Sequence, residues 1–239
     1  SVSYSKDWKG KYNLSVNLNH NQNNNLRLVN MNLPTVNFNV VTFYPFQPKE
    51  QVGAGKWYEK IGIGYSGNFQ NQISFYDTAF SVRRILDTIQ YGAQHNIPIT
   101  LSLPSLGPIT IAPSISYSER WYGQRNFRSW NNTTNKVDTV IQRGFYTARQ
   151  MSFGLAANTR IFGTYKFKPT SNVIAIRHEI RPTISFNYQP DMNARYYYNL
   201  KVDTSNRTIR VSQFDGGIIG AYGEGAFGGI GFGIDNLLE

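Results

Sequence analysis

The sequence predicts an all-β fold, an antiparallel transmembrane β-barrel of the bacterial outer membrane, represented here by a partial wall of about ten strands. Period-2 alternation recurs along nearly all 239 residues, with apolar side chains on one face and Asn and Ser on the other. Several alternating segments have the roughly 9–11 residues that a tilted strand needs to cross a bilayer. Strands of soluble proteins are usually about 5–6 residues long, so these segments favour a membrane protein.

The segment 12–20 alternates most clearly, because Tyr12, Leu14 and Val16 share one face of the expected strand. The segment 109–122 repeats the pattern, and its end, Trp121 and Tyr122, predicts an aromatic girdle at the membrane interface. The same test predicts six further strands and two weaker ones: 36–44, 61–75, 92–103, 152–162, 180–188 and 230–238, with 194–202 and 208–214 as the weaker pair.

Connections in the second half of the chain alternate in character. We expect short turns at 104–108 and 166–172, a long polar loop at 123–143, and further loops at 189–193 and 216–229. Outer-membrane barrels have short turns at one rim and long loops at the other. No low-complexity linker or break in composition interrupts the pattern, so residues 1–239 are predicted to form one partial barrel domain.

Three prolines fall inside expected strands: Pro98, Pro113 and Pro182. Each removes a donor from the ladder of backbone hydrogen bonds. They predict bends or bulges, and the alternative is a softened seam in the wall.

The polar faces must point into a watery lumen, because an unpaired polar group in hydrocarbon costs roughly 2–7 kcal/mol. Arg can bind phosphate in a bidentate manner, which suggests a cationic wall for an anionic head group. The alternative is that the arginines on this face are solvated by water and pair with acidic residues such as Glu179. The candidate lumen-facing residues are the cationic Arg120, Arg160 and Arg181 and the polar Asn13, Ser15, Asn17, Ser114 and Ser116.

Composition excludes several classes of protein. No apolar run approaches the roughly 18 residues of a membrane helix, and cysteine is absent, which rules out disulfides and thiolate metal sites in this stretch. The net charge of +10 would suit nucleic acid, but the basic residues are scattered, so we expect no nucleic-acid partner.

Residues 1–7 lack the features of a signal peptide, so we expect a removed leader or, preferably, an internal piece of a longer protein.

No arrangement of residues predicts an enzyme. No G-x-S-x-G elbow is present, and the glycine-rich stretch 216–229 has no βαβ unit around it. The acidic residues are dispersed, and His178 and Glu179 fall on opposite faces of one expected strand. We therefore expect no catalytic residues, no metal site and no cofactor.

Several strings, in order along most of the chain, resemble the Bacteroidota branch of the lipopolysaccharide-assembly outer-membrane protein family LptD, also called organic solvent tolerance protein. They are residues 36–46 (VNFNVVTFYPF), 94–99 (QHNIPI), 111–122 (IAPSISYSERWY), 176–188 (IRHEIRPTISFNY) and 231–239 (GFGIDNLLE).

The resemblance implies an integral outer-membrane protein whose large barrel receives lipopolysaccharide from a periplasmic bridge and releases it sideways into the outer leaflet. It also implies an LptE-like plug lipoprotein, contact with outer-membrane lipid, and bridge components reached through a β-jellyroll domain. This chain has no jellyroll portion and too few strands for that barrel, so it looks like an internal part of the wall.

The sequence allows two other interpretations. The same kind of wall suits a porin or another large outer-membrane export barrel, with a structural or channel role. A secreted β-sandwich that binds glycans through exposed Tyr and Trp is the third reading, although the strand lengths argue against it.

Three Asp-Thr-aliphatic tripeptides resemble O-glycosylation sites of exported Bacteroidota proteins. Their acceptors would be Thr78, Thr88 and Thr139, all in expected long loops.

Overall fold

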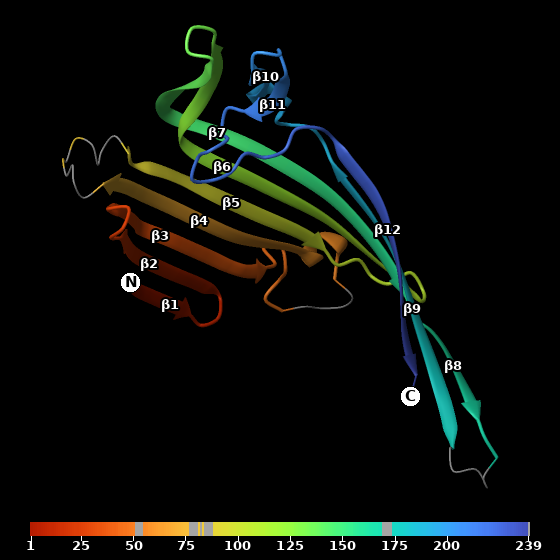
Figure 1. Cartoon of the computed structure of the whole chain (residues 1–239). Coiled ribbons are helices and arrows are strands. Elements are labelled where there is room, and N and C mark those ends of the chain that lie inside the picture. The colour runs from red at the N-terminus through yellow and green to blue at the C-terminus, as the bar shows by residue number, and fades with distance from the viewer. Residues whose placement is uncertain (51–54, 77–80, 82, 84–87, 169–173, 239) are drawn as a thin grey trace.

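The main body of the molecule is a single curved antiparallel sheet of ten strands that does not close on itself (Figure 1). The computed structural model describes residues 1–50, 55–76, 81, 83, 88–168 and 174–238. The all-β, antiparallel fold class predicted from the sequence is confirmed, and it is consistent with a partial barrel wall. Among the described residues, no helix is long and apolar enough to span a membrane.

The sheet follows the chain order from β1 to β7 and then continues through β9 to β12, with β8 also paired to β9. A separate two-stranded hairpin, β10–β11, lies outside the sheet. The strands are β1 (Val2–Trp8), β2 (Tyr12–Asn23), β3 (Leu28–Phe43), β4 (Ile61–Tyr76), β5 (Gln90–Leu101), β6 (Ile109–Asn131), β7 (Lys136–Thr159), β8 (Ile161–Lys166), β9 (Ala175–Gln189), β10 (Tyr197–Lys201), β11 (Thr208–Ser212) and β12 (Phe227–Leu238). Two short 3-10 helices, η1 (Trp57–Lys60) and η3 (Ala194–Tyr196), precede β4 and β10.

Neighbouring strands are paired in a register that places polar side chains opposite polar side chains. Asn13 of β2 is opposite Asn39 of β3, and Ser116 of β6 is opposite Ser152 of β7. Side chains at paired positions lie on the same side of a sheet. The sheet therefore has one face of Asn, Gln, Ser and Thr, which we call the polar face, and one of Ile, Leu, Val and aromatic residues, which we call the apolar face.

The predicted polar loop at 123–143 is wrong. These residues extend β6 and β7 into a long hairpin that turns at 132–135. Apolar pairs such as Phe127 opposite Val140 continue the ladder, and the Asn131 side chain accepts hydrogen bonds from the N–H groups of Thr133 and Thr134 in the turn. Charged residues interleave with these pairs, which concealed the alternation in the sequence.

The two weaker predicted strands, 194–202 and 208–214, exist but are not part of the wall. They form the hairpin β10–β11, with Tyr197 opposite Ser212. Strand β1 was not predicted, and β3 and β7 begin earlier than predicted. The short turn expected at 166–172 lies mostly outside the described residues.

The prolines coincide with gaps in pairing at two of the three sites. No pair is formed at Pro98 on the β4 side or at Pro182 on the β7–β8 side, whereas Pro113 stays in register opposite Leu155. Registers on either side of Pro182 are in step: Asn158 is opposite Thr183 and Ile161 is opposite Ile180. Strand β8 is therefore the continuation of β7, and the β8–β9 hairpin projects past the end of β6 (Figure 1).

Strand β12 presents alternate glycines on the polar face. Gly229, Gly231 and Gly233 lie opposite Asn187, Ser185 and Thr183 of β9. A Cβ at Gly231 would lie 2.7 Å from the Ser185 hydroxyl oxygen. The apolar face of β12 carries Ile230, Phe232 and Ile234 instead, all more than half exposed.

Candidate functional site

The polar face carries side chains that are hydrogen-bonded to one another across strands. Asn68 donates to the Asn37 side-chain oxygen at 2.6 Å, and Asn37 donates to the Ser15 hydroxyl at 3.3 Å. The hydroxyls of Ser116 and Ser118 both donate to the Asn96 side-chain oxygen, at 3.1 and 2.9 Å. These groups are partly buried, not packed away, so they form a wettable surface across β2 to β6.

The apolar face leaves large hydrophobic side chains exposed. Leu155 is 47% exposed, Phe186 47% and Phe232 73%, and these residues lie on the adjacent strands β7, β9 and β12. Contiguous exposed apolar surface of this extent is unusual for a soluble monomer. The arrangement is what contact with acyl chains requires.

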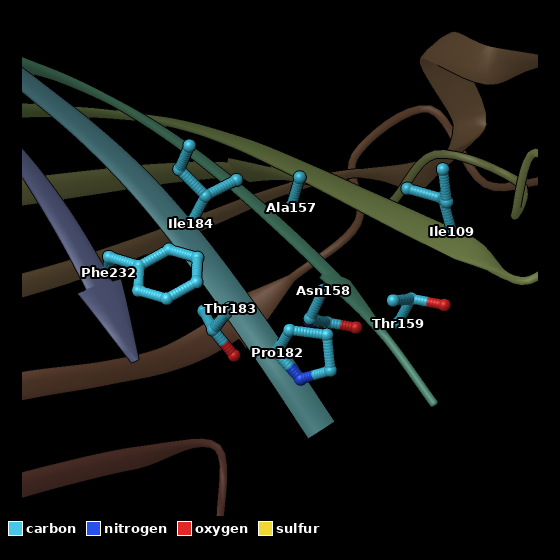
Figure 2. Close-up of a pocket in the computed structure, with 8 residues that line it drawn as sticks. All are labelled: Ile109, Ala157, Asn158, Thr159, Pro182, Thr183, Ile184 and Phe232. Atoms are coloured by element: carbon cyan, nitrogen blue, oxygen red, sulfur yellow. The ribbon is translucent and has the colours of Figure 1, made fainter. Parts of the chain in front are cut away.

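A small apolar pocket lies in the apolar face near the end of β6. It has a volume of about 230 Å³ and is lined by Ile109, Ala157, Asn158, Thr159, Pro182, Thr183, Ile184 and Phe232. Figure 2 shows Ile184 of β9 next to Phe232 of β12, with Ala157 of β7 on its other side. The pocket suits a methylene chain better than a polar ligand.

An aromatic cluster crosses β5 to β7 on the apolar face. The Trp121 ring lies 4.2 Å from His95 and 5.6 Å from Phe145, measured between centroids. Of the two residues predicted for an interface girdle, Trp121 belongs to this cluster on the apolar face. The prediction is wrong for Tyr122. Successive residues of a strand point to opposite faces, so Tyr122 lies on the polar face, where it is only 4% exposed.

The sequence reasoning missed a charged residue on the apolar face. Glu119 accepts hydrogen bonds from the Tyr117 hydroxyl and, at 2.8 Å, from the Trp121 indole N–H. It is also opposite Arg149 in the register. The run Tyr117-Ser118-Glu119-Arg120-Trp121 contained the signal, because residues 117, 119 and 121 share a face.

The best-packed part of the described chain lies where residues 190–226, between β9 and β12, fold onto the polar face; we call these residues the 190–226 segment. The Tyr122 and Phe214 rings stack with centroids 4.0 Å apart. Ala148 of β7 joins them, with Ile219 and Tyr222 of the segment. Residues 216–226 of the predicted glycine-rich loop thus cover part of the wall, whereas residues 227–229 of that predicted loop belong to β12.

Arg120 contacts this segment directly. Its guanidinium donates to the Gly220 carbonyl at 2.7 Å and lies 4.0 Å from the centre of the Tyr222 ring. It also donates to Gln94 on the neighbouring strand at 3.3 Å. The predicted cation Arg120 is therefore on the polar face, where it holds the segment against the wall.

Further hydrogen bonds fix both ends of the segment. The Asp191 carboxylate accepts from the N–H groups of Asn193 and Ala194 at 2.9 and 3.0 Å. Together with the N–H of Gly225, these bonds hold the pKa of Asp191 below its ordinary value. Asp191 thus ties the beginning of the segment to its end.

The other two predicted cations lie at the opposite end of the wall. Arg181 donates to Glu179 at 2.7 Å, and Arg160 lies 3.8 Å from the same carboxylate oxygen. The structure brings Arg160 and Arg181 together but not Arg120. The expected pairing with Glu179 is present. His178 and Glu179 are successive residues of β9, so they lie on opposite faces, as predicted.

The predicted polar residues share one face. Asn13, Ser15 and Asn17 alternate along β2 and are opposite Asn39, Asn37 and Thr35. Ser114 and Ser116 alternate on β6, opposite Gly154 and Ser152. The predicted grouping of these residues on one face is present.

The three threonines of the tripeptide motifs are in different settings. Thr78 lies outside the described residues, and Thr88 is exposed. Thr139 is exposed too, but it belongs to β7 and not to a loop, which corrects the prediction. Among the described residues, no group of three or more His, Asp or Glu side chains could hold a metal ion.

Comparison with known proteins identifies one family. A family model described as LptD protein matches residues 1–239, the whole of the chain. No curated protein and no solved structure matches it. LptD proteins are outer-membrane β-barrels with a role in lipopolysaccharide transport and no known catalytic function. The ten-stranded antiparallel sheet, its exposed apolar face and the match over the full length lead to one conclusion: the chain belongs to the LptD protein family.

Proposed function

We propose that residues 1–239 form one partial barrel domain, an internal part of the wall of a Bacteroidota LptD protein. In that wall the apolar face meets membrane lipid and the polar face lines the lumen. The wall contributes to moving lipopolysaccharide and inserting it into the outer leaflet. No covalent chemistry is needed, because the lipid only has to keep its head group in a polar environment while its acyl chains reach hydrocarbon.

The segregation of the two faces carries this proposal. The ladder of amides and hydroxyls that includes Ser15, Asn37 and Asn68 offers hydrogen bonds to sugars and phosphates. A lumen of this kind lowers the cost of carrying a hydrated head group past hydrocarbon. Arg120 adds a positive charge to the same face.

The two ends of the wall differ, which supports an orientation. The 190–226 segment and the long β6–β7 hairpin lie at one end, whereas the tight turns at 9–11 and 102–108, with the longer connection between β3 and β4, lie at the other. Barrels of the outer membrane place longer loops outside the cell and short turns in the periplasm. We therefore place the 190–226 segment at the extracellular end.

The family supports general partners: lipopolysaccharide and the other Lpt proteins. We further propose an LptE-like plug lipoprotein in the lumen and periplasmic bridge components that dock through a jellyroll domain outside residues 1–239. We also propose glycosylation at Thr78, Thr88 and Thr139, which the intact mass of protein from its native host would test.

Photocrosslinking in cells tests the transport role. A photoreactive residue at Ser116, on the polar face, should give adducts with lipopolysaccharide that disappear when the supply of newly made lipid stops. The matched control is Ile115, the preceding residue on the apolar face, whose adducts with resident membrane lipid should persist. Absence of lipid adducts at Ser116 during active export would contradict the proposal.

A further inference from the structure

We propose that the projecting end of the β7–β8–β9 wall carries a docking site for the phosphate groups of an amphipathic lipid. The site is formed by Arg160, Arg177 and Arg181 around Glu179, with Phe162 and Leu237 beside them. This proposal rests on the proposed function, since it specifies where the wall first meets a phosphorylated lipid.

The arginines converge because of strand register. Arg177, Glu179 and Arg181 alternate along β9 and so share its polar face. Glu179 is 8% exposed, and its Oε1 accepts a hydrogen bond from Arg181 Nε at 2.7 Å with Arg160 Nε at 3.8 Å. A nearly buried carboxylate thus holds two guanidiniums side by side.

The charges at this site do not balance. Among the described residues of β8 and β9, and Arg160 just before β8, four cations lie on the polar face at this end of the wall, because Lys166 of β8 joins the three arginines. Two carboxylates oppose them: Glu179, and Asp235 of β12, which is opposite Arg181. Four positive and two negative charges leave a net charge of +2, which suits a phosphate dianion.

The surroundings are amphipathic, unlike the Asn and Ser surface elsewhere on the polar face. The Arg177 guanidinium lies 5.3 Å from the centre of the Phe162 ring, and Phe162 is 64% exposed. Leu237 of β12, opposite Glu179, is 41% exposed. A free phosphate ion would gain nothing from these apolar groups, whereas a phosphorylated lipid would place its acyl chains on them.

The position of the site suits a first contact with the transported lipid. It lies where β8 and the first half of β9 project beyond the end of β6, at the end of the wall that carries the turns at 9–11 and 102–108 (Figure 1). Under the orientation proposed above, this end faces the periplasm. The surface is therefore accessible to a lipid arriving from that side.

A binding experiment with the full-length protein in its natural complex, held in detergent micelles, tests the site. The probes are diphosphorylated lipid A, the same lipid with its phosphates removed, and inorganic phosphate. We expect the diphosphorylated lipid to bind about tenfold more tightly than the dephosphorylated lipid, and the triple variant R160Q/R177Q/R181Q to lose this difference. Inorganic phosphate alone should bind far more weakly than either.

A matched control is available. Arg207→Gln removes an arginine whose side chain is 72% exposed, the same as that of Arg160, and which is ion-paired with Asp203 on the β10–β11 hairpin. It should leave lipid A affinity unchanged. If the triple variant does not fold, R160Q and R177Q tested singly should each weaken binding about threefold.

Equal affinity of the wild-type protein for the two lipids, or unchanged affinity in R160Q and R177Q, would overturn the site. Binding of inorganic phosphate as tight as that of lipid A would overturn the assignment to a lipid. Either result could occur while Ser116 still forms adducts with exported lipopolysaccharide, so the docking site can fail while the transport role stands.

Discussion

The ring of Tyr122 on β6 lies parallel to the ring of Phe214, with 4.0 Å between their centroids and 7° between their planes. Tyr122 belongs to the wall, and Phe214 belongs to the 190–226 segment. Both are almost fully buried, at 4% and 3% exposure. Their contact is the centre of the hydrophobic core among the described residues, so the segment's position depends on it.

Truncating Phe214 should therefore release the segment. Replacing a buried Phe by Ala typically costs about 3–5 kcal/mol, and here the cost falls on local packing and not on the wall. For F214A we expect residues 213–222 to exchange amide hydrogens faster and to become sensitive to protease. The control is F46A, because Phe46 is 54% exposed and follows β3 at the end of the wall away from the 190–226 segment. Equal protection in F214A and the wild type would contradict the prediction.

Arg120→Gln should loosen the same segment to a smaller extent. The change removes the hydrogen bond to the Gly220 carbonyl and the contact with the Tyr222 ring, together about 1–3 kcal/mol. Hydrogen exchange at residues 219–222 is the measurement, with Arg207→Gln as the control. No change in exchange would mean that Arg120 does not hold the segment.

The ends of the segment should respond to acid through Asp191. Its pKa is held below the ordinary value, first by the Asn193 N–H and then by those of Ala194 and Gly225. A depressed pKa in the folded state means that the stabilisation is present at neutral pH and is lost as the pH falls through that pKa. Exchange at residues 193, 194 and 225, corrected for its intrinsic pH dependence, should rise only below about pH 4. D191A, which has no side-chain acceptor, should exchange fast at pH 7, and slow exchange in D191A would refute the role.

The assignment of faces predicts opposite tolerance to charge at adjacent residues. Ile115→Arg places a cation on the apolar face and should destabilise the full-length protein in a bilayer by about 2–4 kcal/mol, if residue 115 lies near mid-membrane. Ser116→Arg places the same cation on the polar face and should cost much less. Urea titration of protein folded into vesicles measures both. Equal costs for the two variants would contradict the assignment of the faces.

Much of the wall could be predicted because alternation is a local property. Residues 12–20 and most of 109–122 alternate, so strand and face both follow from the sequence there, with Glu119 and Tyr122 as exceptions. The grouping of Ser114 and Ser116 on one face needs only the period of a strand.

The rest depended on pairing partners that are distant in sequence. Residues 197–201 have strand propensity, but only the tertiary structure shows that they leave the sheet and pack above it. Likewise, Tyr122 is of a residue type common at membrane interfaces. Its burial depends on Phe214, which is distant in sequence. The cluster around Glu179 required the register between β7–β8 and β9, which period-2 alternation alone does not determine.

Strand β12 differs from its neighbours because part of its polar face has no side chains. At Gly229, Gly231 and Gly233 its polar face is bare backbone, opposite Asn187, Ser185 and Thr183 of β9. A bulky molecule that moves along this strip meets only main-chain atoms on the β12 side at three successive positions of the polar face. The clearance beside the strand is then set by the short side chains of β9.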